Sequence, residues 1–329
     1  MSLAKYIQGF FVERLVSQCD ASPNTINAYK HTMRIFVNFL SIKIGCPPAR
    51  IKIDSIDEIL VSEFLCSLEA NRGNSARTRN ARLTCLRSFF NYVAYKEPAL
   101  SWQCQKILSI PSKRYDKNAL TYLDEEEASA LLAAPDRSHW IGRRDYTLLL
   151  LALQTGLRVS ELTGLTRQSV ELGPGACVRC FGKGRKHRAT PLRKDVAREV
   201  AAWVSELPAD PTLPLFPARD GARHISRDAV EQLVRRHVRT AALVRPSLVN
   251  KKVSPHTLRH SAAMSLLTNG VDPAVIALVL GHESIGTTSI YIHEDMEMKR
   301  RALDKVRPVD VQTHGFRPDD KLLAFLEGL

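Results

Sequence analysis

Residues 254–271 read SPHTLRHSAAMSLLTNGV, a stretch that predicts a helix carrying several charged or titratable side chains. His256 and Arg259 lie three residues apart, so they are neighbours on the helix surface. His256 and His260 lie four residues apart and also share a face. Three interpretations remain open at this point: core histidines, half of a zinc site, or groups that handle a phosphate.

The zinc interpretation is the weakest of the three. A zinc hydrolase helix of the H-E-x-x-H type needs a glutamate directly after the first histidine, but Thr257 stands there. Histidines further along the chain would complete a site only by chance. Cys177 and Cys180 form a single C-x-x-C with no second pair of ligands, which favours two strand cysteines over a zinc or redox site. We therefore expect no metal and keep a zinc hydrolase as a minor alternative.

The phosphate interpretation gains support from the rest of the C-terminal half. Phosphodiester cleavage needs cations that hold the phosphate oxygens, a nucleophile, and groups that accept and donate protons. Six side chains of these types follow one another along the chain: Arg158, Lys183, His256, Arg259, His282 and Tyr291. Each has an ordinary structural explanation when taken alone, and Tyr291, between two isoleucines, then reads as a core residue.

Four segments together resemble the tyrosine recombinase family of phage integrases, Xer-type resolvases and related transposon enzymes. They are TGLRVSELTGL (155–165), FGKGRKHRATPL (181–192), SPHTLRHSAAMSLLTNGV (254–271) and LVLGHESIGTTSIYIH (278–293). Their order and spacing make the resemblance specific over residues 120–305, whereas over residues 1–105 it rests on a helical pattern. Ala262 and Met264 depart from the commoner family residues on the packing side of the helix, which leaves the implied activity intact.

The resemblance implies which residues bind the scissile phosphate. Arg158 and Arg259 would hold its oxygens, and His282 would donate a hydrogen bond to a non-bridging oxygen. Glu161, one turn after Arg158, matches the acidic position of the family. It would support the arginines without taking part in the chemistry.

The resemblance also implies how the strand is cut. Tyr291 would attack phosphorus and form a 3′-phosphotyrosine, while His256 would accept the tyrosine proton as general acid/base. Lys183 would be the general acid toward the 5′-oxygen. The phosphotyrosine conserves the energy of the broken bond, so no cofactor is expected. A Walker A nucleotide loop is rejected because Gly184, with no hydroxyl, follows Lys183.

The bulk composition favours a polyanionic partner. The chain has 329 residues, a formal net charge of +13 and a pI near 9.6. Nucleic acid fits this charge better than a membrane does, because the longest apolar run ends too soon to span a bilayer. Seven cysteines, most of them in apolar surroundings, suggest reduced thiols and hence a cytoplasmic protein, which would be bacterial and bound to the nucleoid through DNA.

The fold is expected to be mainly α-helical, beginning with a four-helix, SAM-like core-binding domain over residues 1–105. Its helices are expected over residues 3–18, 22–44, 56–72 and 75–97, with Ser22 and Asp57 as N-caps. Residues 106–120 are expected to be a linker, since the composition from about Leu100 to Tyr122 shows no apolar period.

A larger, mostly helical catalytic domain is expected over residues 121–312. Its one small antiparallel sheet should lie within residues 170–192, where short apolar segments alternate with glycine-rich turns. Residues 313–329 are expected to be a tail helix with an apolar stripe formed by Leu322, Leu323, Phe325 and Leu326. The stripe either packs on its own domain or, as the resemblance implies, docks on a neighbouring subunit.

Several cations outside the six-residue set are candidates for binding DNA. They are Lys30, Arg34, Arg77, Arg79, Arg82 and Arg87 in the N-terminal helices, and Arg185 and Lys186 at the expected hairpin tip. A solvated charged face is the ordinary explanation for such runs. For the fourth expected helix, residues 75–97, contact with DNA is favoured over a solvated face, because no acidic residue lies between its arginines.

The resemblance implies a site-specific DNA recombinase that acts on double-stranded recombination sites as a homotetramer, with or without sister recombinases, and has no membrane partner. Two rival functions share many of these features. A type IB topoisomerase uses the same groups to relax DNA, and a non-catalytic regulator would only bind it. The helical N-terminal domain and the apolar tail favour the recombinase.

Overall fold

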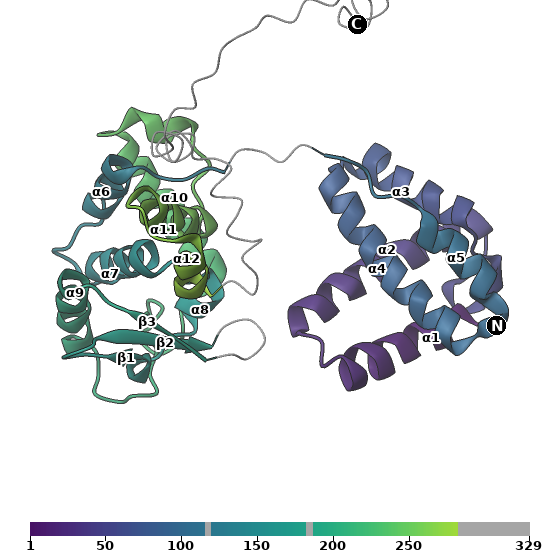
Figure 1. The fold of residues 1–329 in the computed structure, drawn as a ribbon, viewed down its shortest axis with the longest axis horizontal. Coiled ribbons are helices and arrows are strands. Elements are labelled where there is room, and N and C mark those ends of the chain that lie inside the picture. Colours follow the sequence, from purple (N-terminus) through teal and green to yellow (C-terminus); the bar gives the residue numbers. More distant parts are fainter. Residues whose placement is uncertain (116–119, 182–186, 282–329) are drawn as a thin grey trace, which may run out of the picture. The chain divides into compact units, whose positions relative to one another are not determined.

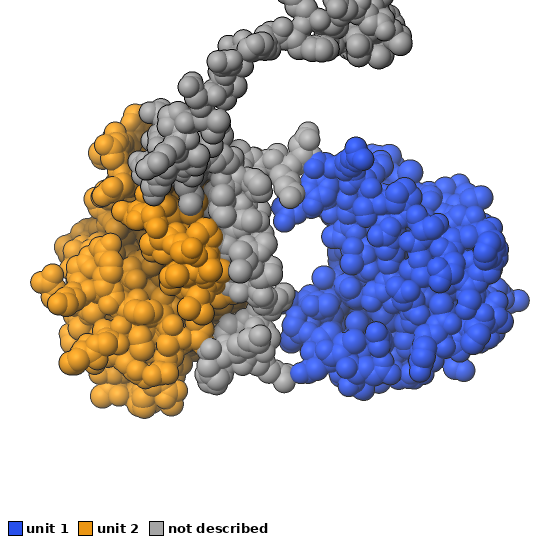
Figure 2. All heavy atoms as spheres, viewed as in Figure 1, with its two compact units in different colours: residues 1–118 blue, residues 119–329 orange. Residues whose placement is uncertain are grey.

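The protein consists of two compact units, residues 1–118 and 119–329 (Figure 2). The computed structural model describes residues 1–115, 120–181 and 187–281, and for Phe181 and His187 it describes the backbone only. Within these ranges the chain is mostly helical, with one small sheet, as expected (Figure 1). None of the described helices has both the length and the apolar character needed to cross a bilayer.

Unit 1 contains the expected helices, each of which begins within two residues of its expected start, and the first of them is divided into an α-helix and a π-helix. Its elements are α1 (Leu3–Gly9), the π-helix η1 (Phe10–Gln18), α2 (Pro23–Ile44), the short 3₁₀ turns η2 (Pro48–Arg50) and η3 (Ile53–Ser55), α3 (Glu58–Arg72), α4 (Ala76–Lys96), η4 (Pro98–Leu100) and α5 (Ser101–Ser109). The hydroxyl of Ser22 accepts a hydrogen bond from the Thr25 N–H at 3.2 Å, and Asp57 accepts one from Leu60 at 2.8 Å.

The fifth helix, α5, is a correction to the expected linker. It packs on α4, buries Cys104 and Ile107, and donates hydrogen bonds from Gln103 to carbonyls of the η3 turn, including Ile53 at 3.2 Å. A helix of nine residues is too short to show a clear apolar period, which is why composition alone suggested a linker. The chain then stays on unit 1, since Asn80 Nδ2 donates to the Lys113 carbonyl at 2.7 Å.

Unit 2 combines helices with one three-stranded antiparallel sheet of order β1-β2-β3. Its elements are α6 (Glu125–Ala133), α7 (Trp140–Thr155), α8 (Val159–Thr163), η5 (Arg167–Ser169), β1 (Val170–Glu171), β2 (Cys177–Phe181), β3 (His187–Pro191), α9 (Lys194–Ser205), α10 (Arg227–Ala242), η7 (Pro246–Asn250), α11 (Pro255–Thr268) and α12 (Pro273–Leu280). The sheet lies where the sequence predicts it, with Val178 paired to Thr190.

The core of unit 2 is built around the apolar helix α7. Leu148, Leu149 and Leu151 are fully buried, and α11 and α9 both pack against this helix. Gly156, which ends α7, has a left-handed φ of 58°. A Cβ on Gly156 would lie 2.3 Å from Leu280 Cδ2, so only glycine allows the end of α12 to approach the end of α7 this closely.

Candidate active site

The C-terminal end of α12 is the point where the site is assembled. The last carbonyls of a helix lack partners within the helix and carry partial negative charge. Three consecutive carbonyls here accept hydrogen bonds from three arginines on three other elements. The pairs are Arg188 Nη1 to Val279 at 3.3 Å, Arg259 Nη2 to Leu280 at 2.9 Å, and Arg158 Nη2 to Gly281 at 3.2 Å. In Figure 1, α8, α11 and α12 lie together.

Arg259 is the most deeply placed of the three arginines. It projects from α11 with a relative exposure of 2%, and its Nη1 donates to the Gly156 carbonyl at 2.6 Å. Its guanidinium group therefore joins the end of α7 to the end of α12. This contact is possible because α11 packs on both helices. A buried, doubly hydrogen-bonded guanidinium is held in one orientation before any ligand arrives.

Arg158 stands at the start of α8, directly after the glycine turn that ends α7. Its Nη1 donates to Glu161 Oε1 at 2.9 Å, and its backbone N–H donates to Glu161 Oε2 at 2.9 Å. The Arg158 side chain is 30% exposed, so its guanidinium is both anchored and open to solvent. Arg158 is thus the arginine of this set that an incoming anion reaches directly.

Glu161 is a buried carboxylate that serves two arginines. Its side chain is 3% exposed, and besides Arg158 it accepts a hydrogen bond from Arg188 Nη2 at 2.9 Å. A carboxylate at this depth would be costly without such partners. Glu161 accordingly lies where the sequence analysis expects a supporting residue.

His256 is exposed on the first turn of α11, one turn from Arg259. Its ring lies against the ring of His260, with centroids 4.3 Å apart and an edge-to-face angle of 69°. Burial, followed by electrostatic interactions with His256 and Arg259, lowers the pKa of His260 to about 4. His260 is therefore neutral at neutral pH and adds no charge beside His256.

Five of the expected site residues lie outside the described residues. They are Lys183, Arg185, Lys186, His282 and Tyr291. The expected tail helix, residues 313–329, lies outside them as well. Among the described residues, the structure brings together Arg158, Glu161 and Arg259 and exposes His256. Within the same residues no group of three or more His, Cys, Asp or Glu could hold a metal ion.

Arg188 belongs to this cluster and was missed by the sequence analysis. A signal was present, because Arg188 lies five residues after Lys183 in the same quoted segment. An arginine whose side chain is only 10% exposed needs a partner inside the fold. The sequence could not show that this partner is Glu161, which lies 27 residues earlier in the chain.

The expected DNA-binding residues of unit 1 fall into two groups. Lys30, Arg34 and Arg77 are exposed. Arg79 is 6% exposed, and its Nη1 donates to the Pro111 carbonyl at 2.9 Å, so the expected exposed face is wrong for this residue. Its cation holds the chain that follows α5 instead of facing solvent.

Two further arginines of α4 are also engaged within unit 1. Arg82 Nη1 donates to Thr32 Oγ1 at 2.8 Å, which ties α4 to α2. Arg87 Nη2 donates to the Ile110 carbonyl, which ties α4 to the end of α5. Both side chains are partly exposed, so their contacts within the fold leave part of each available to solvent.

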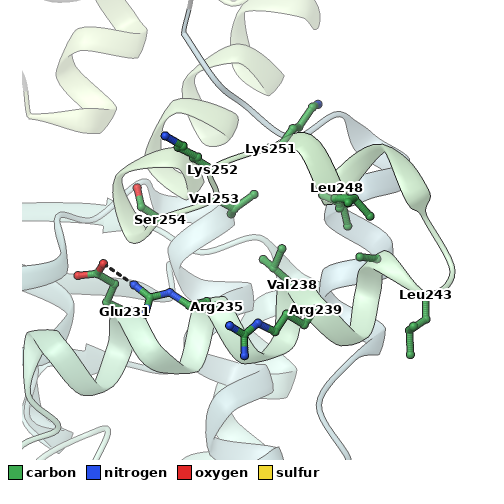
Figure 3. A pocket seen from close by; sticks show the side chains of 12 residues that line it. Glu231, Arg235, Val238, Arg239, Leu243, Leu248, Lys251, Lys252, Val253 and Ser254 are labelled. Atoms are coloured by element: carbon green, nitrogen blue, oxygen red, sulfur yellow. Dashed lines mark hydrogen bonds and ion pairs between the residues drawn. The ribbon is translucent and has the colours of Figure 1, made fainter.

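A basic groove in unit 2 was not anticipated from the sequence. It has a volume of about 670 Å³ and runs between α10 and residues 248–254, which lead into α11 (Figure 3). Its apolar floor includes Val238 and Leu248, and four cations line it: Arg235, Arg239, Lys251 and Lys252. The missed signal was the run of cations in VRRHVRTAAL, spaced for one face of a helix.

Two of the groove cations are already paired within the protein. Arg235 Nη2 lies 3.1 Å from Glu231 Oε1, and Lys251 Nζ lies 2.6 Å from the buried Glu127. Arg239 and Lys252 are exposed. Since Ser254, which lines the groove, is the N-cap of α11, the groove ends two residues from His256.

Comparisons with known proteins agree with this geometry. A model of the phage integrase family matches residues 121–298, and a model of the N-terminal SAM-like domain of phage integrases matches residues 9–97. A Sinorhizobium fredii protein described as an integrase/recombinase is 46% identical over 328 residues, which is 100% of this chain and 98% of that protein. Tyrosine recombinase XerC of Pelobacter propionicus is 31% identical over 295 residues, covering 89% and 92%.

A solved structure gives the same result for the fold. XerH site-specific recombinase, bound to a palindromic difH substrate, superposes with a TM-score of 0.70 at 24% identity, covering 87% of this chain and 81% of that one. The chain belongs to the phage integrase family and is a tyrosine-type site-specific recombinase.

Proposed function

We propose that the protein cuts and rejoins double-stranded DNA at specific sites through a 3′-phosphotyrosine formed by Tyr291. The observation that supports this most directly is the arrangement of Arg158 and Arg259, which hold the neighbouring carbonyls of Gly281 and Leu280 from different helices. Two guanidinium groups so close together suit a phosphate, because each presents a fork of donors and neither loses its proton.

The proposed reaction is a pair of balanced transesterifications. The Tyr291 hydroxyl oxygen forms a bond to phosphorus and the bond to the 5′-oxygen breaks. His256 accepts the tyrosine proton, and Lys183 donates a proton to the leaving 5′-oxygen. A 5′-hydroxyl of the partner strand then attacks the phosphotyrosine and gives its proton to Lys183, while the bond to the Tyr291 oxygen breaks and this oxygen takes back a proton from His256. Arg158, Arg259 and His282 stabilise the charge that develops on the non-bridging oxygens.

We assign DNA binding to cations of both units. In unit 1 these are the exposed Lys30, Arg34 and Arg77, and in unit 2 they are the exposed Arg239 and Lys252 of the groove in Figure 3. Arg185 and Lys186, which lie outside the described residues, are assigned the same role. The partly engaged Arg82 and Arg87 take a smaller part, and Arg79 acts inside the fold. Contacts of this kind bind phosphates and give affinity that falls with salt.

Recombination joins two duplexes, so we propose that four copies assemble on DNA, alone or with sister recombinases, in the bacterial cytoplasm at the nucleoid. The tail helix with Leu322, Leu323, Phe325 and Leu326 would dock on a neighbouring copy. Deleting residues 318–329 should then abolish assembly of paired sites while sparing cleavage of a single site. Unchanged recombination by the deleted protein would contradict the docking of the tail.

The catalytic assignment is tested by covalent capture. A pool of nicked random-sequence duplexes is incubated with the protein, and adducts that survive denaturant are recovered and sequenced. Tyr291→Phe should abolish the adduct and leave DNA binding unchanged, because only the nucleophilic oxygen is removed. A covalent adduct formed by the phenylalanine variant would show that another residue is the nucleophile.

The same covalent-capture experiment distinguishes a site-specific recombinase from a type IB topoisomerase. A recombinase should enrich a defined sequence and join two captured sites into a recombinant product. A type IB topoisomerase would instead relax supercoiled plasmid without a partner site. Relaxation without any recombinant product would overturn the assignment.

A further inference from the structure

We propose that Arg188 is a positioning residue for DNA cleavage: it offsets the negative charge of Glu161, so that a net positive charge faces the phosphate, and it holds Arg158 in place at the end of α12. The proposal rests on the function given above. Arg188 lies on β3, and its side chain is 10% exposed. It acts through Glu161 and through the Val279 carbonyl, both of which accept hydrogen bonds from its guanidinium group.

The first observation is that one carboxylate is shared by two guanidinium groups. Glu161 Oε1 accepts from Arg158 Nη1 at 2.9 Å, and Glu161 Oε2 accepts from Arg188 Nη2 at 2.9 Å. Two guanidinium groups and one carboxylate carry one net positive charge. Without Arg188, the charge of Glu161 would cancel that of Arg158, and the exposed arginine would attract a phosphate much less.

The second observation is that Arg188 spans two elements of the site. Nη2 reaches Glu161 on α8, while Nη1 donates to Val279 at the end of α12 at 3.3 Å. The neighbouring carbonyls of α12 are held by Arg259 and Arg158. A planar guanidinium can make both contacts at once, whereas a lysine ammonium on a flexible stem is a single point charge.

The closeness of packing agrees with a fixed position for this side chain. A Cβ added to Gly281 would lie 2.6 Å from Arg188 Nη1 and 2.9 Å from Arg188 Cδ. Gly281 thus leaves room for Arg188 beside the last turn of α12. An arginine enclosed in this way keeps its geometry when DNA arrives, which is what a preorganised phosphate site requires.

The test measures single-turnover cleavage of a duplex recovered by covalent capture with the natural protein. Arg188→Met keeps an unbranched stem and removes the charged guanidinium group, and it should slow cleavage about a hundredfold, because small displacements at a reacting centre have effects of this size. The affinity for DNA should change by less than about threefold, since one of many phosphate-facing charges is affected.

A double variant separates charge balance from simple loss of packing. In Arg188→Met with Glu161→Gln, the uncompensated carboxylate is also removed, so the positive charge of Arg158 is no longer offset. The double variant should cleave about tenfold faster than Arg188→Met alone, a coupling typical of residues in direct contact. If Arg188 only filled space, adding a second change would slow cleavage further.

A modified substrate gives an independent readout. Replacing a non-bridging oxygen of the scissile phosphate by methyl removes its negative charge, so the loss caused by Arg188→Met should shrink at least about tenfold. Equal losses on the charged and neutral substrates, or no rescue in the double variant, would overturn the proposal.

Two further variants keep the test decisive. Arg179→Met on the neighbouring strand β2 removes an arginine from an exposed pair with Glu171, and it should leave cleavage unchanged. If Arg188→Met does not fold, Arg188→Gln, which also removes the charge but keeps hydrogen-bond donors, is measured on both substrates under the same criteria. Absence of cleavage by the natural protein would instead refute the proposed function.

Discussion

At the scale of single residues, the site contains a histidine held in its neutral form. His260 packs against His256 on α11, and Arg259 on the same helix adds a further positive charge. Burial is the largest cause of its lowered pKa, about 4 against an ordinary value near 6.5. In the unfolded chain His260 takes up a proton more readily than in the folded protein.

This difference predicts how stability depends on pH. Above about pH 6.5 His260 is neutral in both states and has no effect. As the pH falls toward 4, the unfolded state gains a proton that the folded state resists, so stability is lost across this window. His260→Gln should flatten the pH dependence of the urea midpoint between pH 6.5 and 4. An unchanged slope would show that other groups dominate.

At the scale of elements, the end of α12 is the feature on which the site depends. Gly281 has a φ of 64°, and a side chain there would be strained by the backbone and would also press on Arg188. Gly270, just after α11, also has a positive φ, of 79°, but no atom lies within 4 Å of an added Cβ. Substitutions at these two glycines therefore distinguish the cost of backbone strain, which both share, from the cost of steric crowding, which only Gly281 has.

We expect Gly270→Ala to lower the free energy of unfolding by about 1 kcal/mol through the backbone alone. Gly281→Ala should lower it by more and should also slow cleavage, because Arg188 is displaced. Chemical denaturation and single-turnover cleavage measure the two effects. Equal stability losses in both variants, with unchanged cleavage, would contradict the crowding at α12.

Helix boundaries were the part of the fold that the sequence predicted best. Capping residues act locally, so Ser22, Asp57 and Gly156 could be recognised from their neighbours alone. The helices α5 and α8 were missed because nine and five residues are too few to show a period. Their existence depends on contacts with distant segments.

The candidate site was predicted in part for a similar reason. Motifs identified Arg158 and Arg259, whose proposed roles come from the resemblance to the family. The burial of Arg79 and the pairing of Arg188 with Glu161 depend on which segments meet in three dimensions. Neither follows from local sequence, because an arginine looks the same in a motif whether it binds DNA or the protein's own backbone.

At the scale of the whole molecule, a net charge of +13 is spread over two units. Many of the 47 lysines and arginines are paired with carboxylates in the fold, so the number of cations overstates what DNA can meet. The exposed Arg239 and Lys252 beside the groove differ from the paired Arg137, whose Nη2 lies 2.7 Å from Glu199.

Removing the exposed groove cations should lower both the affinity for DNA and the dependence of that affinity on salt. Arg239→Ala and Lys252→Ala should each lower affinity for all sequences and reduce the slope of log affinity against log salt by about 1. Arg137→Ala, the control, should leave the slope unchanged. Binding isotherms at several salt concentrations measure this, and unaltered slopes in the groove variants would place the DNA elsewhere.

The three arginines on consecutive carbonyls also limit how this enzyme can be engineered. Each added helical residue advances the helix end by about 1.5 Å and turns it by about 100°. One insertion in α12 would therefore misalign Arg158, Arg188 and Arg259 in a single step. Exposed positions of α12 such as Leu278 can be exchanged freely, but the number of residues between Pro273 and Gly281 cannot. In a chimaera, the crossover point belongs outside this segment.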